Sequence, residues 1–172
     1  MRKKIICFVI MLVGVVSFLP AATDQFFFEL NGGVWFYPGF GAKVGWMHFW
    51  NNEKIGFIAD VSYYNNGFVH KDEGHDWREE IKIAHNFGIA AGVVFNNMGF
   101  NGALRTSQHI KLKGVYSIWD RPSLSGLGLD VGFKLNWFFT EKTALSTGIG
   151  LDIVPLPYPY ISLGMTFTRG KN

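Results

Sequence analysis

Strict alternation between apolar and polar residues is the feature that most constrains the fold of this chain. In the stretch LGLDVGFKLNWFF, Leu127 to Phe139, one parity holds Leu, Leu, Val, Phe, Leu, Trp and Phe, and the other holds Gly, Asp, Gly, Lys, Asn and Phe. Successive side chains of a β-strand point to opposite faces, so this pattern predicts a strand with two different faces. In a soluble sheet the apolar face is the core, whereas in a membrane barrel it faces lipid.

The first 22 residues have the pattern of a secretory signal peptide. Basic residues at positions 2 to 4 precede an apolar run from Ile5 to Leu19, and a Pro-Ala-Ala sequence ending at Ala22 follows. The run is shorter than the ~20 residues of a membrane-spanning helix. We therefore expect cleavage after Ala22 and a mature domain over residues 23–172. The single cysteine, Cys7, lies in the removed part.

Removal of this segment also changes the charge balance. The full chain has 16 Lys and Arg residues against 13 Asp and Glu residues, and three of the basic residues lie in the first four positions. The mature chain is therefore neutral, and the basic pI of about 9.0 predicts no nucleic-acid partner. The remaining length of about 150 residues is that of one domain.

Alternation recurs in eight segments of the mature chain. They are Phe26–Phe36, Ala42–Trp50, Ile55–Tyr63, Ile81–Phe95, Leu104–Leu112, Leu127–Phe139, Leu145–Ile153 and Ile161–Phe167. Eight is an even number, and several segments reach the ~9–11 residues that a tilted membrane strand needs. The sequence therefore predicts an all-β fold, an eight-stranded antiparallel up-and-down transmembrane β-barrel.

The connections between these segments agree with such a barrel when the amino end lies in the periplasm. The outer connections are then Tyr37–Gly41, Tyr64–Glu80, Lys113–Gly126 and Val154–Tyr160, and the inner ones are Asn51–Lys54, Asn96–Ala103 and Thr140–Ala144. Long loops outside and short turns inside are typical of outer-membrane barrels.

The polar parity of the strands is expected to line the bore. It is rich in glycine and carries the charged residues Glu29, Lys43, Asp60, Lys82, Arg105, Lys111, Asp130, Lys134 and Asp152. Because an unpaired buried charge is costly, we expect these side chains to form ion pairs that close the bore. The expected neighbours are Lys43 and Lys82 around Asp60, Lys111 beside Asp130, and Arg105 or Lys134 near Glu29. Trp35 is the one large apolar side chain expected in the outer half.

The apolar parity carries none of the charged residues and is expected to face lipid. Its aromatic residues fall into two bands, as the girdles of membrane barrels do. The inner band is expected to contain Phe26, Phe28, Trp46, Trp50, Phe95, Trp137, Phe139 and Phe167, and the outer band Phe36, Tyr37, Tyr63 and Tyr160. His48 and His85 share this parity and are interpreted as interfacial residues.

The last predicted strand carries a family resemblance. In the segment SLGMTFTR, Ser162, Gly164 and Phe167 are similar to the carboxy-terminal insertion signal that the barrel-assembly machinery recognises, although Arg169 stands where a second aromatic residue is expected. The mature chain as a whole resembles the small eight-stranded outer-membrane proteins, the group that includes the OmpA transmembrane domain, OmpX and OmpW. The resemblance implies a membrane barrel inserted by that machinery.

Catalytic and metal sites have weaker support in the sequence. Asp130 and Asp152 are candidates for paired carboxylates, and His109 for a base beside Ser107 or Ser146, but ion pairs in a narrow bore explain the same residues. In the loop segment HKDEGHDWREE, side chains able to bind a metal include those of His70, Asp72, His75 and Asp76. A solvated surface loop is the preferred interpretation. We expect no catalytic residues, cofactor or metal.

We expect a monomer in the bacterial outer membrane with a structural, adhesive or protective role. Its expected partners are lipid, the barrel-assembly machinery and an extracellular ligand at the outer loops. One alternative is a passage for small apolar molecules, which the resemblance to the OmpW group implies. A further alternative is a soluble lipocalin-like periplasmic carrier, whose apolar parity would point inward.

Overall fold

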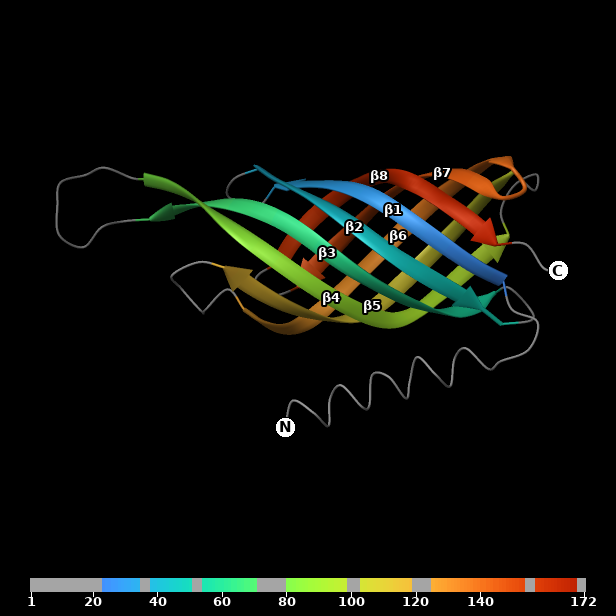
Figure 1. Ribbon diagram of the computed structural model, residues 1–172, viewed down its shortest axis with the longest axis horizontal. Coiled ribbons are helices and arrows are strands. Elements are labelled where there is room, and N and C mark those ends of the chain that lie inside the picture. The colour runs from blue at the N-terminus through green and yellow to red at the C-terminus, as the bar shows by residue number, and fades with distance from the viewer. Residues whose placement is uncertain are drawn as a thin grey trace.

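The computed structural model describes residues 23–34, 38–50, 54–70, 80–98, 103–118, 125–153 and 157–169. Eight strands make up nearly all of this part of the chain (Figure 1). They are β1 (Thr23–Val34), β2 (Pro38–Phe49), β3 (Ile55–His70), β4 (Glu80–Met98), β5 (Leu104–Ile118), β6 (Gly126–Thr140), β7 (Thr143–Ile153) and β8 (Pro157–Arg169).

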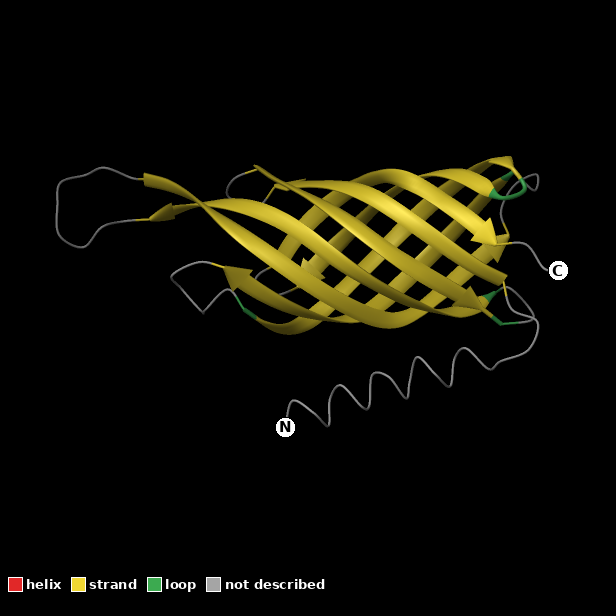
Figure 2. Ribbon diagram, in the orientation of Figure 1, coloured by secondary structure: helices red, strands yellow, loops and turns green. Residues whose placement is uncertain are grey.

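Each strand pairs antiparallel with the next one along the chain, and β1 pairs with β8 to close the barrel. The structure is therefore the up-and-down, eight-stranded antiparallel barrel that the sequence predicts. No helix that is long and apolar enough to cross a membrane occurs among the described residues. Figure 2 shows that strands and short turns account for them.

The two ends of the barrel differ in their connections. The chain enters β1 and leaves β8 at one end, here called the terminal end, which also holds the β2–β3, β4–β5 and β6–β7 connections (Figure 1). At the opposite end, here called the hairpin end, β3 and β4 continue together well beyond the other strands. Their pairing runs as far as His70 and Glu80.

The register of the strands shows that they are staggered around the barrel. Following the paired residues once around from Thr23 leads back to β1 at Gly33, ten residues further along. This path passes through Thr23, Phe49, Gly56, Val94, His109, Gly132, Gly150, Tyr160 and Gly33. Such a stagger accompanies a strong tilt of the strands relative to the barrel axis.

The two faces of the wall have opposite character. The outward parity carries exposed aliphatic and aromatic side chains on every strand, for example Leu30, Val61, Ile110 and Leu163. The inward parity holds the buried charged residues. This arrangement is the reverse of what a soluble lipocalin-like carrier requires, because the apolar face of such a carrier would line the interior.

Several strands are longer than the sequence predicts. β3 continues seven residues beyond the predicted end at Tyr63, and β5 continues six residues beyond Leu112. The predicted loops Tyr64–Glu80 and Lys113–Gly126 are therefore partly strand. Polar residues such as Asn65 are typical of loops, so the sequence predicts a loop here. The antiparallel ladder is formed by backbone groups, however, and does not require apolar side chains.

Candidate functional site: the barrel interior

Glycines in the wall make room for long side chains inside the barrel. A Cβ atom on Gly132 would lie 2.5 Å from Cε1 of His109, and one on Gly88 would lie 2.7 Å from Cε of Lys113. Glycine weakens a strand unless another group must approach closely. These positions therefore lack side chains because long side chains of the neighbouring strand occupy the space beside them.

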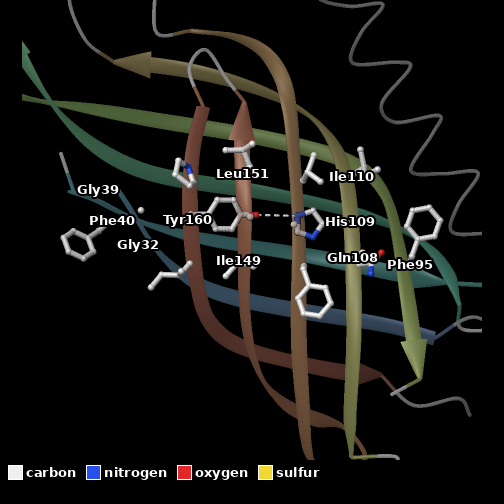
Figure 3. A pocket seen from close by; sticks show the side chains of 17 residues that line it. Gly32, Gly39, Phe40, Phe95, Gln108, His109, Ile110, Ile149, Leu151 and Tyr160 are labelled. Atoms are coloured by element: carbon white, nitrogen blue, oxygen red, sulfur yellow. Dashed lines mark hydrogen bonds between the residues drawn. The ribbon is translucent and has the colours of Figure 1, made fainter. Parts of the chain in front are cut away.

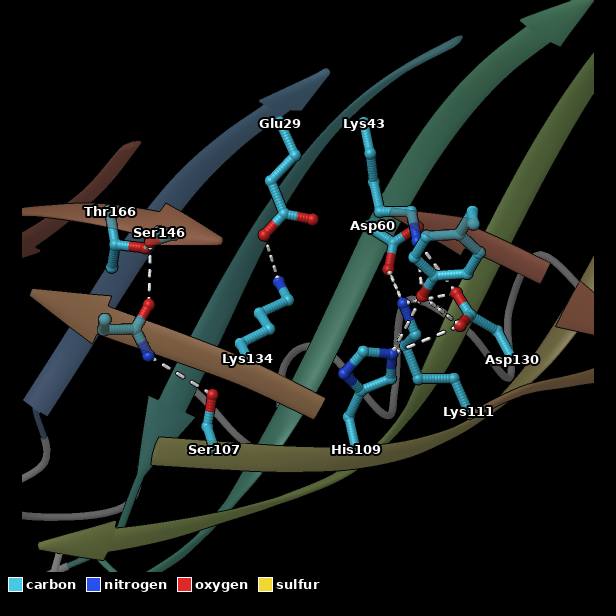
Figure 4. A network of polar contacts seen from close by, with 12 residues as sticks. Glu29, Lys43, Asp60, Ser107, His109, Lys111, Asp130, Lys134, Ser146 and Thr166 are labelled. Carbon is cyan, nitrogen blue, oxygen red and sulfur yellow. Dashed lines mark hydrogen bonds and ion pairs between the residues drawn. The ribbon is translucent and has the colours of Figure 1, made fainter. Parts of the chain in front are cut away.

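Asp130 on β6 is the centre of the interior network (Figure 4). Its Oδ2 lies 2.9 Å from Nζ of Lys43 and 2.7 Å from Nζ of Lys111. Its Oδ1 accepts a hydrogen bond of 2.8 Å from the hydroxyl of Tyr160 and lies 3.2 Å from Nε2 of His109. The network continues from Lys111 to Asp60, whose Oδ2 is 2.6 Å from the same ammonium.

Two further ion pairs flank this centre. Nζ of Lys134 lies 2.5 Å from Oε1 of Glu29, and Lys113 pairs with Asp152. The four carboxylates and four ammonium groups named so far are all buried. Their charges balance, which is what burial in a narrow bore requires because an isolated buried charge is strongly unfavourable.

Most of these pairs join strands that are not neighbours in the sheet. Lys43 and Asp130 connect β2 to β6, and Glu29 and Lys134 connect β1 to β6. The pairs of Lys111 with Asp60 and of Lys113 with Asp152 connect β5 to β3 and to β7, whereas the pair of Lys111 with Asp130 joins the neighbouring strands β5 and β6. The ion pairs therefore cross the interior and hold opposite parts of the wall together, in addition to the backbone ladder.

An apolar cluster fills the interior towards the terminal end. It consists of Phe27, Met47, Phe49, Ile58 and Val94. Nζ of Lys134 lies 3.9 Å from the centre of the Phe27 ring, at the border between this cluster and the charged network. The sequence prediction assigned the interior by polarity and so did not find this cluster.

Hydroxyl and amide groups fill the rest of the interior at the height of this apolar cluster. The Ser146 hydroxyl donates a hydrogen bond of 2.7 Å to Oδ1 of Asn136 and lies 2.7 Å from the Thr166 hydroxyl. The amide of Asn136 also lies 3.4 Å from the Ser107 hydroxyl. These groups satisfy one another without an ion pair.

Tyrosines fill the interior towards the hairpin end. The rings of Tyr64 and Tyr158 stack with their centres 5.8 Å apart, and the Tyr158 hydroxyl donates a hydrogen bond of 3.1 Å to the carbonyl oxygen of Gly39. Nζ of Lys113 lies 4.7 Å from the centre of the Tyr64 ring, and Nζ of Lys43 lies 4.6 Å from that of Tyr160. Trp35, which the sequence predicts to be the large apolar side chain of this region, lies outside the described residues.

The structure corrects three details of the predicted interior. Tyr160, predicted to face lipid at the outer rim, points into the bore. Lys113, predicted to begin a loop, lies on β5 and is buried. Asp60 pairs with Lys111 on β5, whereas its predicted neighbour Lys43 pairs with Asp130. A lysine side chain is long enough to cross the bore, so its partner need not lie on an adjacent strand.

The other predicted interior residues are placed as follows. Arg105 is half-buried near the terminal end, with its guanidinium 4.9 Å from the centre of the Phe138 ring. The backbone of Lys82 lies in β4, but its side chain is outside the described residues. Ser162 and Gly164 are at bore parity on β8, and Phe167 is exposed on the outward face. The cleavage position Ala22 lies outside the described residues.

The candidate catalytic residues do not form a catalytic arrangement. His109 contacts Asp130 and Tyr160, whereas Ser107 and Ser146 both contact Asn136. All of these side chains are buried, and they form two separate hydrogen-bonded groups. They therefore form structural hydrogen bonds rather than an accessible nucleophile and base.

No group of three or more acidic, histidine or cysteine side chains in the described strands and turns has the proximity to hold a metal ion. The loop residues Asp72, His75 and Asp76 lie outside the described residues, as does the side chain of His70.

An apolar depression lies over β5 to β8 and also includes residues of β1, β2 and β4. Ile110, Ile149 and Leu151 line it, and so do Tyr160 and His109, which contact each other (Figure 3). It opens on the face that carries the exposed aliphatic residues, so it is part of the apolar surface.

Solved structures with similar folds are small membrane barrels. A de novo designed transmembrane β-barrel has a TM-score of 0.56 at 7% identity, covering 86% of this chain and 95% of the designed one. Ail, the attachment invasion locus protein of Yersinia pestis, in a phospholipid bilayer nanodisc has a TM-score of 0.54 at 14% identity, covering 87% of this chain and 100% of Ail. The structure of Ail in complex with the heparin analogue sucrose octasulfate has a TM-score of 0.52 at 12% identity, covering 86% and 97%.

No family model matches the sequence, and no curated protein matches it. At these identities the structural similarity shows the fold, which is that of the small eight-stranded outer-membrane β-barrels.

Proposed function

We propose that the chain is a non-enzymatic β-barrel of the bacterial outer membrane, in which a closed barrel anchors surface loops with a structural, adhesive or protective role. The observation that carries this proposal is the division of the wall into an apolar outward face and an interior closed by balanced ion pairs. An apolar exterior on closed strands is stable in lipid, where every backbone group must be satisfied internally.

In this proposal the terminal end faces the periplasm and the hairpin end faces the cell exterior. Short turns on the side of the chain ends and longer connections on the other are typical of such barrels. The extension of β3 and β4 beyond the other strands, with pairing as far as His70 and Glu80, supports this orientation, because the longer hairpins of such barrels lie on the side of the cell exterior (Figure 1).

Export through a signal peptide cleaved after Ala22 and insertion by the barrel-assembly machinery belong to the same proposal. The sequence pattern of the first 22 residues supports the first step. Ser162, Gly164 and Phe167 support the second by their resemblance to an insertion signal. We propose a monomer, because the interior charges are balanced within one barrel.

Contact with an extracellular ligand at the outer loops is supported by the fold of Ail, which is an attachment protein and has been solved with a heparin analogue. The passage of small apolar molecules has less support, because the described interior near the hairpin end contains the Lys113–Asp152 ion pair and stacked tyrosines. An apolar solute would have to displace these polar groups.

Fractionation of cells that produce the full chain tests the proposal. We expect the protein in the outer-membrane fraction after washes with high salt and carbonate. We also expect it to migrate differently on gels before and after boiling, because a closed barrel resists detergent until it is heated. Recovery in the soluble periplasmic fraction, or identical migration before and after boiling, would contradict the proposal.

A further inference from the structure

The outward face of the eight strands carries one acidic and one basic residue in the described part of the chain. By strand parity these are Asp24 on β1 and Arg169 on β8. The two are direct partners in the β1–β8 register, at the terminal end of the seam that closes the barrel. Charges on the lipid side of a barrel are unfavourable unless they lie at the interface, so their placement opposite each other calls for a reason.

The carboxylate of Asp24 is held towards β2. Its Oδ1 accepts a hydrogen bond of 3.1 Å from Nε1 of Trp46 and lies 2.8 Å from Nδ1 of His48. His48 is almost completely buried, whereas the Asp24 side chain keeps 32% of its surface exposed. The acid is therefore fixed in one orientation and remains accessible to a ligand.

Arg169 lies on the other side of β1 and is exposed. Aromatic residues of the outward face surround this end of the barrel, including Trp50, Trp137 and Phe167. Aromatic girdles lie at the level of lipid headgroups, so in the proposed orientation the two charges lie where headgroups of the periplasmic leaflet lie.

We propose that Asp24 and Arg169 form a binding site for the zwitterionic headgroup of an aminophospholipid. A guanidinium binds phosphate oxygens through paired N–H donors, and a carboxylate accepts hydrogen bonds from a primary ammonium. A phosphoethanolamine group carries both partners in one short unit. A phosphocholine group carries the phosphate but has no N–H donor for Asp24, so the site discriminates between the two.

This inference rests on the proposed function, because it requires the barrel to lie in a bilayer. A direct ion pair between Asp24 and Arg169 is the competing explanation, and exposed pairs of this kind contribute little stability. Such a pair would give the protein no preference among headgroups, so headgroup selectivity distinguishes the two explanations.

The test uses the folded protein in vesicles that contain equal amounts of phosphatidylethanolamine and phosphatidylcholine with identical acyl chains. Native mass spectrometry of the released protein measures the ratio of the two retained lipids. We expect an enrichment of phosphatidylethanolamine of about fivefold, corresponding to roughly 1 kcal/mol. We expect Asp24→Asn and Arg169→Gln each to bring the ratio close to that of the vesicles.

The double variant Glu141→Gln with Lys142→Gln is the matched control. It removes one acid and one base from the exposed β6–β7 turn at the same end of the barrel and should keep the enrichment. Heat-dependent gel migration verifies that each variant is folded, and the intact carboxylate of Arg169→Gln keeps the test valid if Asp24→Asn does not fold.

Two results would overturn the inference. They are equal retention of the two lipids by the folded wild type, and enrichment of an anionic lipid in their place when one is added. Failure of the protein to enter any vesicle would instead contradict the proposed function. The two failures are therefore distinguishable.

Discussion

At the scale of single residues, Asp130 is the group on which the interior depends. Its carboxylate contacts four side chains from three other strands, which are Lys43 on β2, His109 and Lys111 on β5, and Tyr160 on β8. Lys111 has Asp60 as a second partner, but Asp130 is the carboxylate nearest to Lys43 among the described ion pairs. The loss of this one charge leaves a cation in the bore without its counter-ion.

We therefore expect Asp130→Asn to destabilise the folded barrel strongly. Removing one partner of a buried ion pair costs on the order of 3–5 kcal/mol, because the other charge stays buried. Urea unfolding in detergent micelles measures the effect. Glu141→Gln in the exposed β6–β7 turn is the control and should change the free energy of unfolding by less than about 0.5 kcal/mol. Equal unfolding midpoints for the two variants would show that the interior charges do not stabilise the barrel.

A second prediction at this scale concerns the glycines of the wall. The methyl group of Gly132→Ala would lie 2.5 Å from Cε1 and 2.8 Å from Nε2 of His109, so the histidine must move away from Asp130. On the outward face of β1, nothing lies within 4 Å of the corresponding position on Gly32. We expect Gly132→Ala to lower the unfolding midpoint and Gly32→Ala to leave it unchanged or raise it slightly. The opposite order would indicate that the bore has spare room.

At the scale of elements, the long β3–β4 hairpin is the most distinctive part of the fold. Its backbone pairing is continuous from the barrel to His70 and Glu80, so the hairpin is an extension of the wall. Figure 1 shows that β3 and β4 extend beyond the other strands at this end of the barrel.

The proposed orientation, with the β3–β4 hairpin facing the cell exterior, predicts which residues are accessible from outside the cell. We expect Asp72→Cys, in the segment between β3 and β4, to react with a membrane-impermeant maleimide in intact cells. Lys142→Cys, in the β6–β7 turn at the terminal end, should react only after the outer membrane is opened. Labelling of Lys142→Cys alone in intact cells would show that the barrel has the opposite orientation.

At the scale of the whole molecule, the interior is filled along its length by three kinds of packing. Apolar side chains and hydroxyl groups occupy the terminal end, ion pairs the middle, and tyrosines the hairpin end. We expect the folded protein to conduct no appreciable ion current in planar bilayers, because an eight-stranded barrel has just enough space for side chains. Large, steady single-channel currents from the wild type would contradict this and would favour a transport function.

The sequence predicts the fold well because strand parity is a local property. The alternation at Leu127–Phe139 and the segments like it identify all eight strands and the apolar outward face. It does not identify the ends of β3 and β5, since polar residues such as Asn65 occur in both loops and extended ladders.

The interior is predictable only in part, because pairing across a bore depends on depth and side-chain length. The charged residues Glu29, Asp60 and Asp130 are placed inside by parity, but parity does not indicate that Lys43 reaches Asp130 across the barrel. It also assigns polar character to the interior, so Phe27 and Ile58 are unexpected there. The partners of the interior residues become clear only when the strand register shows which side chains lie at the same depth in the bore.

Closure of the barrel by its first and last strands determines when the chain can fold. Asp24 pairs with Arg169, so the seam joins residues at opposite ends of the described part of the chain. Contacts between residues so far apart in sequence form late in folding. The chain must first lose the conformational entropy of closing a long loop, and only then do the contacts add stability. Until β8 is present, β1 has an unpaired edge, which is prone to aggregation. The pairing of β8 with β1 is therefore the step that removes the last open edges of the sheet.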